Sequence, residues 1–363
     1  MKKLVLCWFF ISVLCIRAFA QDPAFSQSYN NPVYLNPALT GANDGLKINM
    51  NDMRQWTAVP GTFNTFTTTA DLAEECSSIG LGLIALHDER GEGFLTTDQF
   101  GLTGRWGAPI IAKKLDFAFG IGGSFAQKSL DWSKLQFSDQ FDPILGQISS
   151  TNSQPHQSGI PYADIDAGIS LKFLFDYRPG FTVLNNIGFA VHHLNRPDIG
   201  LITESNLPSL YTLHAGSVIP ISRAWKQKGD FLFPYAVYNW QEVFNTAFKV
   251  QREFIGGFYV YNRNFMYGLL YRDGYLPFTG GNTNQLGFSA GYQIPFKNTA
   301  YAFQLTYSYT FPFTGLSYSV QGTHEISLII IFDRVSILCG GGKGAPTANK
   351  CYYDKRSGFI PQL

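Results

Sequence analysis

The sequence predicts an all-β fold, a transmembrane antiparallel β-barrel of about 14 strands. Three observations predict it: apolar and polar residues alternate in many segments, the N-terminus carries an export signal, and the connections alternate between short and long. The alternation is clearest over residues 301–311, YAFQLTYSYTF, where aromatic or aliphatic side chains take every second position. Because successive side chains of a strand point to opposite faces, this segment has one face suited to lipid and one suited to a wet interior.

The first residues have the features of a secretory signal. Two lysines precede an apolar stretch over residues 4–16 and a small-x-small site at residues 18–20, so that cleavage leaves Gln21 first. A lipoprotein signal through Cys15 fits less well, because the leucine before it is bulkier than the usual small residue. No later run reaches the roughly 18 to 20 apolar residues of a membrane helix. The chain is therefore expected to be exported and to span a membrane, if it does, with strands.

Charge and length limit the class of protein further. Without the signal the chain has 24 basic and 26 acidic residues, a net charge of −2, and no basic run that would attract nucleic acid. The 363 residues could form several soluble domains, but a large barrel can use this length as one domain. We expect a signal peptide at 1–20, a periplasmic or plug-like segment at 21–44, the barrel at 45–332 and a periplasmic tail at 333–363.

The segment before the barrel is irregular and aromatic. Pro23, Pro32 and Pro37 rule out one continuous helix or central strand, yet Phe25 and Tyr29 are among the side chains that need burial. Two arrangements stay open at this point. The segment packs into or under a barrel mouth, or it simply caps the first strand.

Fourteen segments alternate well enough to be strands, and the alternation is weakest over residues 231–261. These segments are residues 46–51, 66–72, 77–86, 94–106, 115–122, 164–173, 183–191, 210–219, 231–239, 247–261, 265–271, 285–293, 301–311 and 323–332.

The connections support the same fold. Those after even-numbered strands are mostly short, as at 262–264, whereas those after odd-numbered strands are long, as at 128–160, 192–208 and 312–321. Short periplasmic turns and long outer loops are typical of outer-membrane barrels, and a soluble β-sandwich has no reason to alternate in this way. With an inward-side N-terminus, both chain termini are expected in the periplasm.

No constellation of catalytic residues stands out. His192 and His193 would point to opposite faces of a strand and so would not chelate one metal, and Asp164 and Asp166 share a face that a water-filled interior explains. We therefore expect no enzyme activity, no cofactor and no metal site. An outer-membrane hydrolase would need a nucleophile with its base at the rim, and none is evident.

The cysteines and the tail are considered together. Cys76, Cys339 and Cys351 remain after the signal, and the last two flank a Gly-rich loop that a disulfide could close in an oxidising compartment. A zinc site is not expected, because there is no nearby histidine and no CxxC pair. The mildly basic tail is either a docking element or a free terminus.

Several motifs resemble one known family. PAFSQ (23–27), VYLNPALTG (33–41), RQW (54–56) and FAVHHLNRP (189–197) resemble the PorP/SprF family, outer-membrane proteins of the Bacteroidetes type IX secretion and gliding machinery. The resemblance runs from about residue 21 to residue 332. It implies an outer-membrane barrel without covalent chemistry, which works beside the secretion channel. Its implied partners are a secreted adhesin-type surface protein, periplasmic ring lipoproteins, or both.

The resemblance also marks candidate site residues, either for partner binding or for folding. They are Phe25, Ser26, Gln27, Tyr34, Asn36, Pro37, Gly41, Arg54, Trp56, His193, Asn195 and Pro197. The competing hypothesis is a passive porin or hydrophobic-solute channel of similar strand number, which would need an open lumen.

Overall fold

The structure is a computed structural model, and it describes most of the chain between residues 22 and 332. The described residues are 22–42, 45–58, 61, 63–74, 78–91, 95–111, 114–142, 144, 146–148, 158–178, 181–201, 204–221, 230–242, 250–276, 281–295, 301–314 and 321–332. The expected signal peptide, the tail with Cys339 and Cys351, and Cys76 lie outside them. Within the described residues, no helix has the length and apolar character needed to cross a membrane.

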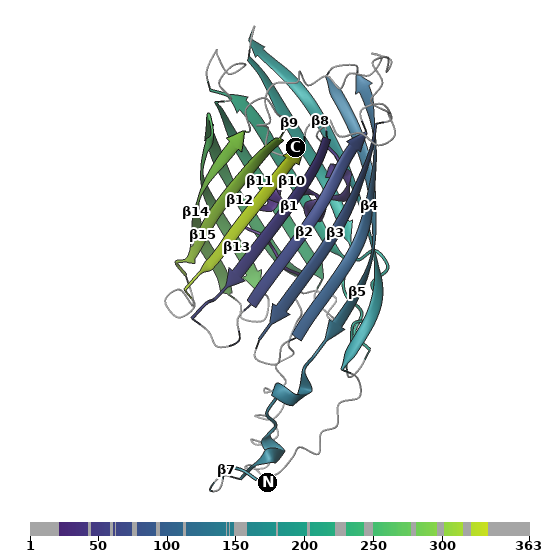
Figure 1. Cartoon of the computed structure of the whole chain (residues 1–363), viewed down its shortest axis with the longest axis vertical. Coiled ribbons are helices and arrows are strands. Elements are labelled where there is room, and N and C mark those ends of the chain that lie inside the picture. Colours follow the sequence, from purple (N-terminus) through teal and green to yellow (C-terminus); the bar gives the residue numbers. More distant parts are fainter. Residues whose placement is uncertain are drawn as a thin grey trace, which may run out of the picture.

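Fourteen antiparallel strands form a closed barrel, which confirms the predicted fold (Figure 1). Each pairs with the next along the chain, and the last pairs with the first through a register that matches Leu46 with Phe332 and Gln55 with Thr323. The strands are β1 (Gly45–Gln55), β2 (Phe63–Glu74), β3 (Ile79–Arg90), β4 (Leu95–Ile111), β5 (Leu115–Ser129), β8 (Gly159–Arg178), β9 (Phe181–His192), β10 (Leu210–Pro220), β11 (Phe231–Glu242), β12 (Val250–Asn262), β13 (Phe265–Leu276), β14 (Gly281–Pro295), β15 (Tyr301–Pro312) and β16 (Thr323–Phe332).

The two faces of β15 match the predicted alternation. Its small polar side chains, such as Thr306 and Ser308, are buried in the barrel, whereas Leu305 and Tyr307 are exposed on the outer wall. The same division holds along β1 and β2, whose buried inward side chains include Asn49, Asn51, Thr67 and Thr69. A period of two places the polar side chains inside and the apolar ones on the membrane side.

Alternation is weak in β11 because both faces of that strand are apolar. The inward side chains of Phe231, Phe233 and Tyr235 are buried, and they form a core with Tyr29 from the N-terminal segment. The outward neighbours Leu232 and Ala236 are also apolar. The polarity pattern fades here because the lumen on this side is itself apolar.

The long connection between β5 and β8 carries small elements of its own. They are η3 (Trp132–Lys134), η4 (Ser138–Gln140) and a two-stranded pairing of β6 (Phe141–Asp142) with β7 (Gly146–Gln147). This connection projects beyond the barrel at the lower end of Figure 1. We call it the outer arm, and the end of the barrel from which it leaves is the long-loop end.

Residues 22–42 lie inside the barrel, and we call them the strap. The strap contains three short helical turns: η1 (Ser28–Asn30), α2 (Pro32–Leu35) and η2 (Pro37–Leu39), seen as dark purple turns within the wall in Figure 1. Every strap residue from 25 to 41 is buried except Tyr34, which is half-buried. The prolines keep these turns short, so the strap follows the lumen as an irregular chain.

The strap runs from one end of the barrel to the other. Asp22 contacts Gln241 near the end of β11, at the long-loop end. Gly41 contacts Asp71 near the end of β2, which is paired with the start of β1. The first and last described residues, Asp22 and Phe332, therefore lie at opposite ends. The two chain termini lie outside the described residues, so the expectation that both are periplasmic stays a prediction.

Candidate functional site

The strap makes polar contacts around the whole inner wall. Asn31 donates to Thr67 of β2 at 2.8 Å, Thr40 shares a 2.9 Å hydrogen bond with Thr103 of β4, and Gln27 donates to Ser308 of β15 at 2.9 Å. Most of these bonds join residues far apart in sequence, so they form only in the folded barrel.

The middle of the strap is fixed by Asn36, one of the predicted residues. Its Oδ1 accepts from the backbone N–H of Ala38 at 2.8 Å, which caps the turn that begins at Pro37. Its Nδ2 donates to the Ile169 carbonyl at 3.1 Å and lies 3.0 Å from Nε2 of His214. His214 is fully buried, and its Nδ1 lies 3.2 Å from the Tyr29 hydroxyl. Since Asn36 donates to Nε2, the ring proton sits on Nδ1.

The wall leaves room for this contact by using glycine. A Cβ at Gly168 would lie 2.0 Å from Asn36 Oδ1, and one at Gly188 would lie 2.2 Å from His214 Nε2. A Cβ at Gly120 would lie 2.2 Å from the carbonyl carbon of Pro37. Side chains at these positions would displace the strap, so the glycines in β5, β8 and β9 allow its close approach.

Ser26 and Gln27 are held by a buried carboxylate. Glu325 in β16 accepts from the backbone N–H of Ser26 at 2.7 Å and of Gln27 at 3.1 Å. The Gln27 amide also donates to the Glu325 carbonyl at 3.2 Å. These hydrogen bonds satisfy strap N–H groups that face the wall and would otherwise be buried without a partner.

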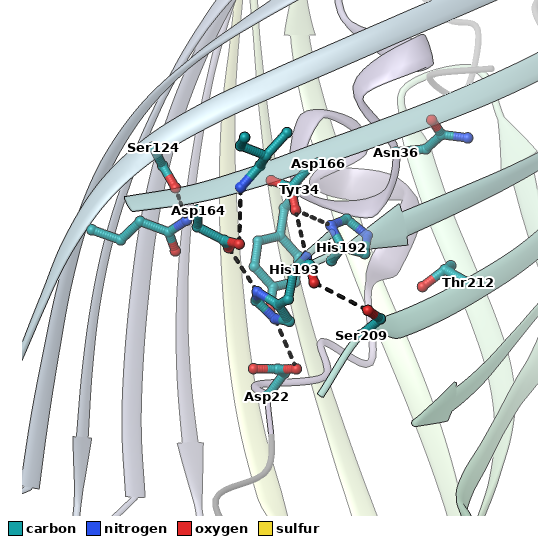
Figure 2. Close-up of polar contacts among 12 residues, drawn as sticks. Asp22, Tyr34, Asn36, Ser124, Asp164, Asp166, His192, His193, Ser209 and Thr212 are labelled. Atoms are coloured by element: carbon teal, nitrogen blue, oxygen red, sulfur yellow. Dashed lines mark hydrogen bonds and ion pairs between the residues drawn. The ribbon is translucent and has the colours of Figure 1, made fainter. Parts of the chain in front are cut away.

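The long-loop end of the strap is bound by His193, as Figure 2 shows. Its Nε2 lies 3.2 Å from the Asp22 carboxylate and its Nδ1 lies 2.6 Å from Asp164 of β8. Gln241 donates to the same Asp22 oxygen at 2.9 Å. Because both ring nitrogens face carboxylates, which only accept, the ring carries two protons and a positive charge.

The backbone after β9 explains how two neighbouring histidines face one strand. His193 lies past the end of β9 with a φ of 57°, and His192 Nδ1 is 3.2 Å from Asp166 while His193 reaches Asp164. The expectation that these histidines point to opposite faces is wrong, because it assumed that the strand continues. Asn195 fixes the turn by accepting from the Ile165 N–H at 3.1 Å and donating to the neighbouring Ala163 carbonyl.

The charges of this cluster shift the pKa values of its members. Burial alone would raise the pKa of Asp22, but the charge and hydrogen bond of His193 outweigh it and lower that pKa to about 2. Burial alone would lower the pKa of His193, but Asp22 and Asp164 raise it well above its ordinary value. The pair is therefore charged at neutral pH.

The same cluster contains atoms of the kind that bind metals. Asp164, Asp166 and His193 each offer one such atom within 4.8 Å of the others. His193 uses both ring nitrogens on carboxylates, so a metal would have to replace a proton that already bridges the group. The arrangement of the described side chains fits an imidazolium between carboxylates better than a metal ion.

A narrow cavity of about 120 Å³ remains between the strap and the wall. It is lined by Asp22, Phe25 and Tyr34 from the strap and by Lys128 and Tyr162 from the wall, among other residues. The rings of Phe25 and Tyr34 pack edge-to-face with their centres 5.3 Å apart, and the Tyr34 hydroxyl donates to the Pro23 carbonyl at 2.7 Å. The first residues of the strap thus fold against its own helical turn.

The remaining predicted residues divide into two groups. Gly41, with a φ of 58°, donates its N–H to Asp71, and Pro197 shapes the β9–β10 loop by accepting from the Leu207 N–H. Arg54 and Trp56 take no part in the strap site. Arg54 is an exposed residue on the outer wall beside Asp52, and Trp56 packs on Phe63 at the rim.

Sequence reasoning did not single out three of the residues that hold the strap. Asp22 belongs to the irregular segment before the barrel, and Glu325 lies in the predicted strand at residues 323–332. His214 lies in the predicted strand at residues 210–219 and has no predicted role. The available signal was their position, since Glu325 and His214 occupy inward places in β16 and β10 among small polar or apolar neighbours.

The comparisons with known proteins give solved structures and one family. Among solved structures, a Pseudomonas aeruginosa FadL homologue covers 87% of this chain and 100% of its own, with 11% identity and a TM-score of 0.45. The Pseudomonas putida toluene transporter TodX covers 86% and 98%, with 10% identity and a TM-score of 0.43. Scores this low carry no argument about this chain. A search of curated proteins found no match.

A family model gives the specific result. The model described as "Type IX secretion system membrane protein PorP/SprF" matches residues 18–330, which include the strap and nearly all of the barrel. The resemblance read from the motifs is thereby confirmed over most of the sequence, and the chain belongs to the PorP/SprF family of type IX secretion system membrane proteins.

Proposed function

We propose that this protein is an outer-membrane scaffold of type IX secretion that binds a secreted surface protein, periplasmic ring lipoproteins, or both. In this role it does not conduct solutes and does not catalyse a reaction. The observation that carries the proposal is the strap, which occupies the lumen from the long-loop end to the start of β1.

A filled lumen supports a scaffold over a pore. The strap is bonded to β2, β4, β8, β15 and β16, so it has wall contacts on all sides. The cavity of about 120 Å³ between the described strap and wall residues is small beside the roughly 300 to 1,000 Å³ of common small-molecule sites. A porin or hydrophobic-solute channel would require the strap to leave.

The outer arm supports partner binding at the long-loop end. It exposes Phe141, Ile144 and Ile148, of which Ile144 is 91% exposed. Apolar side chains grouped on a projecting loop, away from the lipid-facing wall, are typical of protein contact sites. Long loops face outward in outer-membrane barrels, so the arm is the natural contact for a secreted protein.

The side chains of the strap site favour binding over catalysis. His193 has both ring nitrogens on carboxylates, and His214 bonds to Asn36 and Tyr29. Neither ring is therefore placed to activate a serine or cysteine nucleophile.

Two measurements on the intact protein test the proposal. In planar bilayers we expect no steady conductance. Affinity capture from cells that make the secretion machinery should recover a secreted adhesin or a ring component, and the triple change Phe141→Ser, Ile144→Ser and Ile148→Ser should reduce recovery of the adhesin. Steady solute flux together with recovery of neither partner would favour the channel hypothesis.

A further inference from the structure

The strap is anchored to the wall at three places that use carboxylates. At two of them a wall carboxylate accepts from strap backbone: Asp71 from Gly41 and Glu325 from Ser26 and Gln27. At the third, the strap supplies the carboxylate and the wall supplies the cation. Asp22 is therefore the only strap anchor, among these three, that depends on a charged side chain of the strap itself.

The Asp22 anchor lies where the barrel meets solvent. The side chains of Asp22 and His193 are 20% and 14% exposed, whereas Asp164 beneath them is nearly closed off at 2%. Arg90 of β3 lies near Asp22 and adds positive field, while it is itself bonded to Asp88. The ion pair between Asp22 and His193 is largely shielded from water, which strengthens it. Because it lies at the mouth of the barrel, it can break without any change in the pairing of the wall strands.

His193 also links the strap to the loop that covers the mouth. The β9–β10 loop starts at His193, and it buries Ile199 and Leu207 against the inside of the barrel. Its Ser209 donates to the His193 carbonyl at 3.1 Å (Figure 2). One residue thus contacts the strap end, the wall and the loop base.

From this geometry we propose that Asp22, His193 and Asp164 form a latch that keeps the N-terminal end of the strap in the long-loop mouth. Release of the latch frees Asp22 and joins the cavity to the mouth, and it leaves the residues before Ser26 held only by the contacts of Pro23 and Phe25 with Tyr34. The rest of the strap stays bound. The inference goes beyond the scaffold role, since a latch would act in a scaffold or in a channel. One part rests on the proposed function: the latch faces the cell surface only if the long-loop end of the barrel does.

A cysteine at Ala24 reports on the latch. Ala24 is half-buried and lies between the latch and the Glu325 anchor. In a protein whose Cys76, Cys339 and Cys351 are replaced by serine, Ala24→Cys should react slowly with a polyethylene-glycol maleimide. Adding His193→Gln or Asp164→Asn should speed the reaction by about tenfold, the size expected for losing a charged hydrogen bond. Asp22→Asn combined with His193→Gln should add little to either alone, because both break the same contact.

His87 provides a matched control. It forms another histidine–carboxylate pair, with 2.6 Å between its Nδ1 and Asp98, but this pair is exposed on the outer wall of β3 and β4. His87→Gln should leave the labelling of Ala24→Cys unchanged. The proposal is overturned if His193→Gln labels no faster than His87→Gln while both proteins keep the gel mobility of a folded barrel.

Reference cysteines determine the side of the membrane. Ile144→Cys in the outer arm should be labelled on intact cells, as should Ala24→Cys in the His193→Gln protein. Asn262→Cys, at the opposite end of the barrel, should require permeabilised cells. Reversed labelling of the two references would overturn the orientation in the proposed function, whereas the His193 and His87 comparison decides on the latch alone.

Discussion

On the side of β1, β2, β15 and β16 the lumen wall is polar, whereas on the side of β10–β13 it is apolar and aromatic. The polar side presents buried threonine, serine and asparagine, and it bonds to strap polar groups such as Asn31 and Gln27. The apolar side includes Phe231, Phe233 and Tyr259 in one core with strap residues. The strap has a matching polar and apolar side, so the difference fixes its rotation in the lumen.

The two sides of the lumen also contribute differently to the free energy of unfolding, one through apolar packing and the other through hydrogen bonds. Apolar packing against β11 and β12 depends on area and shape, and it is large because aromatic side chains bury much surface. The hydrogen bonds of the polar side contribute less net stability each, because water would satisfy the same groups in the unfolded chain. The first side should therefore supply stability and the second the position of the strap.

The largest effect is expected on the apolar side. Phe233→Ala should lower the free energy of unfolding by about 3 kcal/mol, because it leaves a cavity beside Tyr29, whose ring centre lies 5.2 Å away. Urea titration of the detergent-solubilised protein measures this. The matched variant Leu232→Ala, on the lipid-facing side of the same strand, should cost much less. Equal costs would mean that the strap core does not stabilise the barrel.

The next effect is expected at the Glu325 anchor. Glu325→Gln keeps the shape but replaces one of the two carboxylate oxygens that accept from strap N–H groups with an amide nitrogen, which cannot accept. It should cost about 2 kcal/mol in the same titration, because one buried strap N–H loses its partner. Glu242→Gln removes an exposed pair with Arg196 and should cost less than about 0.5 kcal/mol. A Glu325 variant as stable as the Glu242 variant would contradict this assignment.

The wall was predictable because its sequence pattern repeats along every strand. Each strap contact instead depends on one pair of residues and has no repeating pattern. Residues 301–311 carry six repeats of the alternation, so one odd residue does not hide the pattern. Glu325 instead bonds to Ser26, which is 299 residues away in sequence, and no pattern near either residue indicates this contact. Phe231 and Phe233 weakened the pattern in β11 because the strap, not water, lies opposite them.

The candidate site was predictable as motifs and not as geometry. The motif residues of the strap and of the β9–β10 turn were found, because Asn-Pro pairs and the HHLNRP run are unusual in sequence. That His193 meets Asp22 and Asp164 depends on its positive φ, which a strand pattern cannot indicate. Arg54 and Trp56 belong to the same set of motifs but lie apart from the strap, on the rim.

A smaller effect is expected when pH is varied. Asp22 has a folded pKa of about 2 against an ordinary value of roughly 3.9, so its contribution to the latch is full above about pH 4 and fades as pH falls toward 2. His193 has a raised pKa, so its contribution is full below its ordinary value of roughly 6.5 and is lost as pH rises through the raised value. The latch should loosen at both extremes.

A nitroxide spin label on Ala24→Cys measures this loosening. Its spectrum should show a mobile component that grows as pH falls from about 4 toward 2 and a second one on the alkaline side, with neither near pH 7. With His193→Gln the alkaline transition should disappear, because no ring remains to lose its proton there. A label on Ile144→Cys controls for effects of pH on the barrel as a whole. A spectrum of Ala24→Cys that stays constant down to pH 2 and up to the alkaline pH at which the barrel itself unfolds would contradict the charged pair.

The smallest effect on stability is expected at Arg54. Its side chain is 63% exposed and its partner Asp52 lies 3.3 Å away on the same outer face, so Arg54→Gln should change the free energy of unfolding by less than about 0.5 kcal/mol. The same variant separates the two roles left open for this motif. If Arg54 acts in folding alone, partner capture stays at the wild-type level, and if it contacts a partner, capture falls while urea titration is unchanged. A large loss of stability would contradict both, since nothing described around Arg54 is buried enough to produce it.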